Sequence, residues 1–230
     1  LVIDEHGRRR VVRLEPNGLT TVVADRYEGK RLNSPNDLTY KSDGALYFTD
    51  PPFGLPQAFD DPKKELPFQG VYRLARNGKL TLLTTEVKAP NGIAFSPDEK
   101  ELYVADSARA LWFVFDVKKD GTLSSGKVLF DGAELSKGRP GVADSLKVDV
   151  YGNIFAAAPG GLFILAPDGT LLGRFDLGAR LLVVLEVGDH DLVEHLLVHG
   201  RIENRAQDLD AAGEIARHHV GGRDIDRCLG

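Results

Sequence analysis

Apolar and polar residues alternate in short runs along much of this chain, and each run ends at a polar turn. Leu146, Val148 and Val150, for example, are separated by single polar residues. A period of two predicts β-strands with one buried face. Asn-Gly or Asp-Gly pairs follow such runs at positions 17–18, 77–78, 120–121 and 168–169. Because these residues tolerate positive φ angles, the pairs predict tight hairpins between antiparallel strands.

The runs belong to a longer repeat. A small polar tetrad recurs roughly every 54 residues, a spacing within the range of propeller blades. The tetrads are Ser34-Pro35-Asn36-Asp37, Ala89-Pro90-Asn91-Gly92 and Val142-Ala143-Asp144-Ser145. Each is followed by a strand, a turn, a second strand and then a hairpin, which is the four-stranded meander of one blade. The pattern predicts an all-β propeller fragment of about three to four blades: residues 1–25 end one blade, and three fuller blades follow.

The pattern stops near residue 178. Apolar residues in 191–197 and 207–218 have helical rather than strand spacing. We therefore expect two parts, a partial propeller at 1–178 and an atypical tail at 179–230 whose spacing favours helix. Because the chain starts within an expected strand and contains no Met, we also expect the true N-terminus, with any targeting segment, to lie upstream.

The tetrads also carry the candidate chemistry. Asn36, Asn91 and Asp144 occupy the same place in three successive repeats. Residues just before the innermost strand of a blade lie at one mouth of the central channel, so these side chains should converge. Their oxygens are hard ligands that suit calcium, magnesium or manganese. A turn role, with each side chain bonding its own backbone, is the alternative for any single tetrad; three in register favour the metal site.

Several motifs resemble the SMP-30/gluconolactonase/LRE-like family. They are Lys30-Arg31-Leu32-Asn33-Ser34-Pro35-Asn36-Asp37, Tyr47-Phe48-Thr49-Asp50-Pro51-Pro52-Phe53-Gly54, Pro90-Asn91-Gly92-Ile93-Ala94-Phe95-Ser96-Pro97-Asp98, and Ala143-Asp144-Ser145-Leu146-Lys147-Val148-Asp149, and the opening Asp4-Glu5-His6-Gly7 is similar to the family's preceding blade. The resemblance implies a six-bladed β-propeller with a catalytic divalent cation at the channel mouth, most often Ca²⁺, with Zn²⁺, Mg²⁺ or Mn²⁺ as alternatives. It also implies hydrolysis of sugar lactones.

The resemblance assigns roles to individual residues. Asn91 and Asp144 match the family's metal ligands, and Asp144 also matches its proposed acid/base. Asn36 matches an Asn that contacts the substrate and, in some relatives, the metal. We expect Ser34 and His6 to bind substrate; Ser34 precedes a proline and lacks the setting of a nucleophilic serine. The family's further metal-binding Glu has no counterpart, because the sequence begins after that point.

The composition of the chain argues against some classes of binding partner. The formal net charge of −5 argues against nucleic acid, which usually requires a basic face. No apolar run approaches the roughly 20 residues of a membrane span. Cys228 is the single cysteine, so no internal disulfide is expected. We expect a small-molecule lactone as substrate and a cytoplasmic location, with a periplasmic or secreted one still open.

The sequence thus favours a metal-dependent hydrolase that opens sugar lactones. Two hypotheses stay open beside it: a related phosphotriesterase or strictosidine-synthase-like enzyme, and a non-catalytic propeller or inactive fragment. The aligned Asn36, Asn91 and Asp144 favour the first, because a pure scaffold does not need them.

Overall fold

The computed structural model describes residues 1–176, which form successive antiparallel sheets. The first sheet contains β1 (Val2–Glu5), β2 (Arg10–Leu14) and β3 (Thr20–Ala24), and a two-stranded ribbon of β4 (Arg26–Tyr27) and β5 (Lys30–Arg31) follows it. Three four-stranded sheets come next. The second sheet is β6 (Leu38–Tyr40), β7 (Leu46–Asp50), β8 (Gly70–Leu74) and β9 (Leu80–Thr84); the third is β10 (Pro90–Phe95), β11 (Glu101–Asp106), β12 (Leu111–Asp116) and β13 (Lys127–Asp131); the fourth is β14 (Leu146–Val148), β15 (Ile154–Ala158), β16 (Gly161–Leu165) and β17 (Leu171–Asp176).

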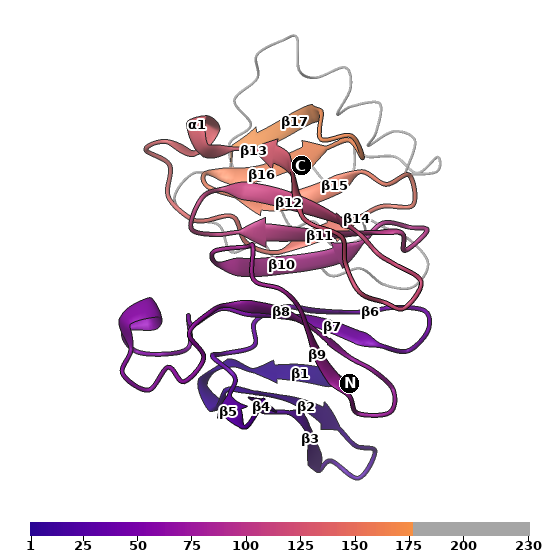
Figure 1. The fold of residues 1–230 in the computed structure, drawn as a ribbon. Coiled ribbons are helices and arrows are strands. Elements are labelled where there is room, and N and C mark those ends of the chain that lie inside the picture. The colour runs from indigo at the N-terminus through magenta and orange to yellow at the C-terminus, as the bar shows by residue number, and fades with distance from the viewer. Residues whose placement is uncertain (177–230) are drawn as a thin grey trace, which may run out of the picture.

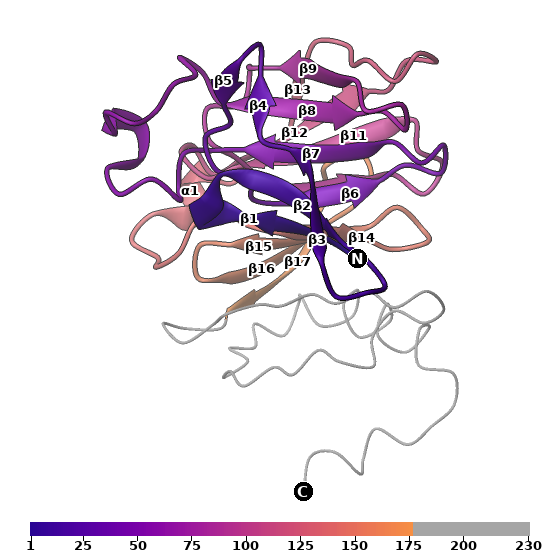
Figure 2. The same ribbon diagram turned by 90° about the horizontal axis from the view of Figure 1, so that it is seen from below.

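The four larger sheets follow one another in space in the order of the chain (Figure 1). Figure 2 shows the ribbon of β4 and β5 beside them. Helical segments are short: the 3₁₀ turns η1 (His6–Arg8) and η2 (Ala58–Asp60) and the single-turn α1 (Ala133–Ser136). Among residues 1–176, no helix has the length and apolar character needed to cross a membrane.

The predicted hairpins are confirmed. The four turn glycines, Gly18, Gly78, Gly121 and Gly169, all adopt φ between 80° and 86°, which other residues adopt only with strain. In the first of these turns the preceding Asn17 accepts a hydrogen bond from the Leu19 amide through its side-chain Oδ1 (3.0 Å). The turns therefore form for the local reason that the sequence indicates.

Two strand boundaries differ from the sequence pattern. Apolar alternation continues to Val150, but β14 ends at Val148 and Val150 is 73% exposed, because Asp149 accepts the amides of Tyr151 and Asn153 and closes a turn. The second tetrad overlaps the start of β10, which begins at Pro90 instead of after Gly92, and a register shift falls between Pro90 and Ile93.

The core lies between the sheets. One apolar cluster joins the first and second sheets through Val11, Phe48 and Tyr72. A second joins the second and third sheets, with Tyr47 and Phe115 among its members. A third joins the third and fourth sheets through residues that include Trp112 and Phe163, whose ring centroids are 5.6 Å apart. Each sheet therefore buries apolar surface against the next, as propeller blades do.

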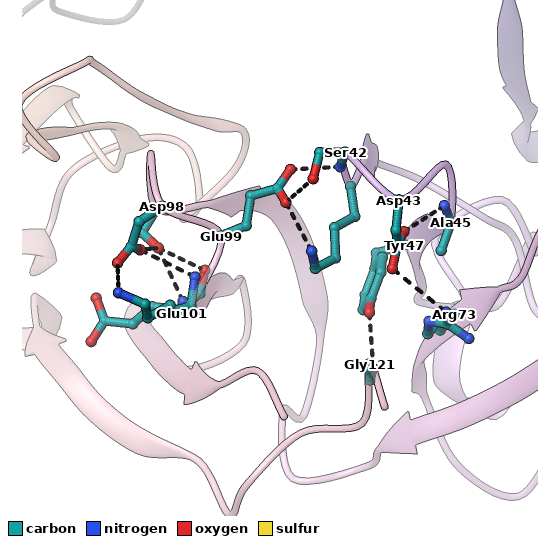
Figure 3. A network of polar contacts seen from close by, with 12 residues as sticks. Ser42, Asp43, Ala45, Tyr47, Arg73, Asp98, Glu99, Glu101 and Gly121 are labelled. Atoms are coloured by element: carbon teal, nitrogen blue, oxygen red, sulfur yellow. Dashed lines mark hydrogen bonds and ion pairs between the residues drawn. The ribbon is translucent and has the colours of Figure 1, made fainter. Parts of the chain in front are cut away.

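Polar contacts also join the second and third sheets at the hairpin end of their first strands, opposite the tetrads (Figure 3). Glu99, in the β10–β11 turn, accepts hydrogen bonds from the Ser42 amide (2.6 Å) and from Lys41 Nζ (2.8 Å). The buried Tyr47 hydroxyl donates to the Gly121 carbonyl (2.9 Å). These contacts fix the two sheets relative to each other far from the candidate site.

The all-β class and the succession of propeller-type blades are confirmed for residues 1–176. The tail predicted at 179–230, its helical spacing and the boundary at 178 lie outside the described residues.

Candidate functional site

The first and third tetrads have the same backbone arrangement. The Asn36 amide donates to the Thr49 carbonyl (3.0 Å), and the Asp144 amide donates to the Ala157 carbonyl (3.0 Å). In both sheets the tetrad residue thus pairs with the second strand, at the end where that strand approaches the neighbouring sheets. The repeat places Asn36 and Asp144 at equivalent positions, as the sequence predicts.

Asn91 lies between these two residues. Thr49 Oγ1 in the second sheet donates to the Asn91 carbonyl (2.8 Å). Asn91 Nδ2 donates to Ser107 Oγ (3.0 Å), and Ser107 Oγ donates to the Ala143 carbonyl, next to Asp144 (2.5 Å). A continuous series of hydrogen bonds therefore connects the three tetrads. The bond to Ser107 also orients the Asn91 amide, so that its Oδ1, the atom suited to a cation, faces away from that serine.

The third and fourth sheets approach very closely at Gly92. A Cβ atom built on Gly92 would lie 2.4 Å from the Asp144 carbonyl oxygen and 2.8 Å from Ser145 Cα. Only glycine allows this approach, which brings the Asn91 and Asp144 backbones together. The two side chains differ in exposure: Asn91 is 4% exposed, whereas Asp144 is exposed and accessible to a ligand.

Asp37, the last residue of the first tetrad, joins three sheets, although sequence reasoning did not single it out. Its carboxylate accepts hydrogen bonds from the Ile93 amide (3.2 Å) and from Ser145 Oγ (3.3 Å) in the next two sheets. Burial raises the pKa of Asp37, and the nearby Lys147 charge opposes that rise. Its place directly after Asn36 in the tetrad was the available signal, but the partners of this carboxylate lie 56 and 108 residues away.

A second unpredicted carboxylate is Asp4. In the first sheet, Asp4 of β1 pairs with Val11 of β2, and a register shift follows Val11. In the second sheet, Thr49 of β7 pairs with Val71 of β8, and a register shift follows Val71 in the same way. Asp4 thus holds in β1 the place of Thr49, whose side chain reaches the neighbouring sheet. Its Oδ1 is buried and has no hydrogen-bond partner among the described residues. Burial, followed by the charges of Asp37 and Asp50, raises the pKa of Asp4 to about 7.

Two buried carboxylates hold the segments that enter the tetrads. Asp50 accepts the amides of Asn33 and Ser34, both at 2.8 Å. Asp106, at the end of β11, accepts the amide of Ala89 in the same way (3.2 Å). The motif Thr49-Asp50 thus has a structural role in shaping the site. Burial raises the pKa of Asp50 to about 7 despite its two amide donors.

Ser34 and His6 form a separate group of contacts with the loop after β7. Ser34 is fully buried; its Oγ donates to the Pro51 carbonyl (2.6 Å) and accepts the Gly54 amide (2.8 Å). A Cβ on Gly54 would lie 2.7 Å from His6 Cδ2 and 2.8 Å from Ser34 Cβ. Ser34 therefore positions this loop, and its predicted contact with substrate stays a prediction.

His6 retains a free ring nitrogen. His6 Nε2 is buried and has no hydrogen-bond partner within residues 1–176. Burial lowers the pKa of His6, so the imidazole is neutral at pH 7 and can donate or accept one hydrogen bond. Its predicted role in substrate binding is compatible with this chemistry and stays a prediction.

The donor chemistry fits a hard cation. Within residues 1–176, no three His, Cys, Asp or Glu side chains gather closely enough to hold a metal ion. A cation here would therefore depend on the amide oxygens of Asn36 and Asn91 together with the Asp144 carboxylate. Ca²⁺ takes about 6–8 oxygen ligands, so water, substrate or further residues would complete the shell. Asp4 and Asp37 lie nearby with raised pKa values, and a bound cation would favour their charged forms.

Several known proteins are similar to this chain in sequence and in fold. A gluconolactonase from Zymomonas mobilis is 42% identical over 177 residues, which are 74% of this chain and 49% of that protein. The structure of a gluconolactonase from Xanthomonas campestris superposes with a TM-score of 0.65 at 38% identity, covering 75% of this chain and 57% of that one. Regucalcin from Agrobacterium tumefaciens shares the fold, with a TM-score of 0.58 at 23% identity over 73% of this chain and 54% of its own.

The family comparison agrees with these similarities. The sequence model of the SMP-30/Gluconolactonase/LRE-like region matches residues 1–193, which include every tetrad and candidate site residue. The chain spans about half the length of the curated gluconolactonase that it matches. With its motifs, its blades and this match in agreement, the chain belongs to the SMP-30/gluconolactonase/LRE-like family.

Proposed function

We propose that the protein hydrolyses sugar lactones of the gluconolactone type, using a hard divalent cation, for which calcium is the first candidate. The observation that carries the proposal is the 42% identity to a gluconolactonase. The hydrogen-bonded series through Asn91 that joins the three tetrads supports it. The choice of calcium rests on the oxygen donors of Asn36, Asn91 and Asp144.

The surroundings of the candidate site residues suit distinct roles in lactone hydrolysis. When bound, a divalent cation would polarise the lactone carbonyl and stabilise the developing oxyanion. The exposed Asp144 carboxylate can take a proton from the attacking water and return it to the departing ring oxygen. Asn36 can hold the substrate hydroxyls by hydrogen bonds. Ser107 keeps Asn91 in a single orientation.

Lactone hydrolysis by the purified protein tests the proposal directly. Acid release from glucono-δ-lactone would be followed by titration, with the spontaneous rate subtracted, after removal of divalent ions by EDTA and after addition of calcium. We expect calcium-dependent hydrolysis. Asp144→Ala should lower turnover at least about a hundredfold, because it removes the proton acceptor. Asp116→Ala, which removes the same charge from an exposed residue of β12, should leave it unchanged.

The outcomes separate the parts of the proposal. Hydrolysis no faster than in buffer, with calcium present, would contradict lactonase activity itself and favour the non-catalytic alternative. Full activity in EDTA would contradict the cation, and near-normal turnover of Asp144→Ala would contradict the role of that carboxylate alone.

A further inference from the structure

A basic surface pocket lies beside the first sheet, outside the candidate active site. It has a volume of about 350 Å³ and is lined by Arg8, Arg10, Asp25 and Arg31. Arg8 belongs to η1, Arg10 begins β2, Asp25 directly follows β3, and Arg31 belongs to β5. Arg31 NH2 donates to the Arg8 carbonyl (2.9 Å), so the segments on two sides of the pocket are fixed to each other. The pocket is therefore a feature of the packed fold.

The guanidinium groups are only partly neutralised. Glu5 pairs with Arg8 at 3.4 Å and also, more closely, with Arg10. No carboxylate of residues 1–176 forms an ion pair with Arg31. Glu65 also lies here, since its carboxylate accepts a hydrogen bond from the Arg31 amide (2.7 Å). The three lining arginines and the neighbouring Arg9, set against Glu5, Asp25 and Glu65, leave one positive charge, in a chain whose formal net charge is −5. The charge at this place is opposite in sign to that of the whole chain.

The surplus depends on Arg9, a buried arginine next to the pocket. Arg9 is 5% exposed, and its guanidinium donates to the carbonyls of Leu32 (2.7 Å) and Lys63 (2.9 Å) rather than to a carboxylate. Burial, followed by the charge of Arg31, lowers the pKa of Arg9, and the charges of Glu65, Asp50 and Asp61 oppose that shift. A charge in a poorly solvated setting acts more strongly than in water. An anion in the pocket would therefore be attracted by the lining arginines and by the buried Arg9.

We propose that this pocket binds a hydroxylated small-molecule oxyanion, such as a sugar phosphate or a sugar acid. Guanidinium groups present paired N–H donors that match the oxygens of phosphate, sulfonate and carboxylate. Asp25 would repel a bare anion but can accept hydrogen bonds from ligand hydroxyls. The four lining residues together therefore select a molecule that carries both an anionic group and hydroxyls. The inference does not depend on the lactonase proposal.

Direct binding measurements test this assignment. Calorimetric titrations at low salt would use glucose 6-phosphate, gluconate and inorganic phosphate as separate probes. We expect glucose 6-phosphate to bind saturably with a Kd on the order of 1 mM and several times more tightly than inorganic phosphate. Arg31→Gln and Arg8→Gln should each weaken binding about tenfold, because each removes a charge-assisted contact.

Two further variants complete the design. Arg26→Gln removes one charge from the adjacent β4, outside the pocket lining, and should change the Kd less than about twofold. Asp25→Asn should weaken glucose 6-phosphate relative to inorganic phosphate. The Arg8 side chain is 72% exposed, so Arg8→Gln should fold normally even if Arg31→Gln does not. Absence of saturable binding, equal loss in Arg26→Gln, or equal affinity for both phosphates with no effect of Asp25→Asn would each overturn the proposal.

Discussion

Gly92→Ala tests whether the close approach of the third and fourth sheets holds the candidate site together. The added methyl would lie 2.4 Å from the Asp144 carbonyl oxygen, 2.8 Å from Ser145 Cα and 2.9 Å from Leu146 N. All three are backbone atoms of the next sheet, so no side chain can rotate away. To reach 3.4 Å, the lower bound of ordinary contact, the Asp144 carbonyl must move by 3.4 − 2.4 = 1.0 Å relative to Gly92.

That displacement has two consequences. Forcing a methyl into a packed contact costs typically about 1–3 kcal/mol of stability. A shift of about 1 Å between catalytic groups can lower turnover about a hundredfold, and here it would separate Asn91 from Asp144. We therefore expect both a lower free energy of unfolding and a much larger relative loss of lactone hydrolysis.

The assay pairs urea denaturation with the lactone titration, on Gly92→Ala and on a matched control. Gly7→Ala introduces the same methyl where no atom lies within 4 Å, and it should change neither quantity appreciably. If Gly92→Ala retains wild-type stability and turnover, the close approach of the third and fourth sheets does not hold the site together, and the reasoning is refuted.

Three further predictions concern single contacts. The folded-state pKa of Asp4, about 7, exceeds the ordinary value of 3.8, so wild-type protein loses stability as the pH rises and this carboxyl loses its proton. Asp4→Asn removes that loss and should therefore gain about 2–3 kcal/mol of stability relative to wild type between pH 5 and pH 8 in cation-free buffer. Parallel pH profiles of the two proteins in urea denaturation would refute this. Ser107→Ala should lower turnover about tenfold by releasing the Asn91 amide, and an unchanged kcat would show that Ser107 does not orient it. Tyr47→Phe should cost about 1 kcal/mol in thermal or urea unfolding, because the buried hydrogen bond to the Gly121 carbonyl is lost, whereas Tyr40→Phe, at a residue 53% exposed, should have no effect.

Features that depend on a few neighbouring residues could be predicted from the sequence. The Asn-Gly and Asp-Gly turns form because the preference for positive φ belongs to the residue itself. The spacing of the tetrads placed Asn36 and Asp144 at equivalent positions, because equivalent residues in a repeat occupy equivalent places in each blade. Where a local contact changed the outcome, as when Asp149 ended β14 before Val150, the apolar pattern alone was misleading.

The sequence by itself determined the all-β class, the succession of blades and the residue types of the candidate site. Only the tertiary structure decided that Asp37 joins three sheets, that Asp4 lies buried beside it, that Ser34 is occupied in holding the loop after β7, and that the arginines around Arg31 enclose a pocket. The physical reason is that backbone preferences and strand periodicity act over a few residues, whereas burial, charge and hydrogen bonding depend on whichever groups the fold brings near. The partner of Asp37 in the fourth sheet is 108 residues away, and no local rule relates residues at that separation.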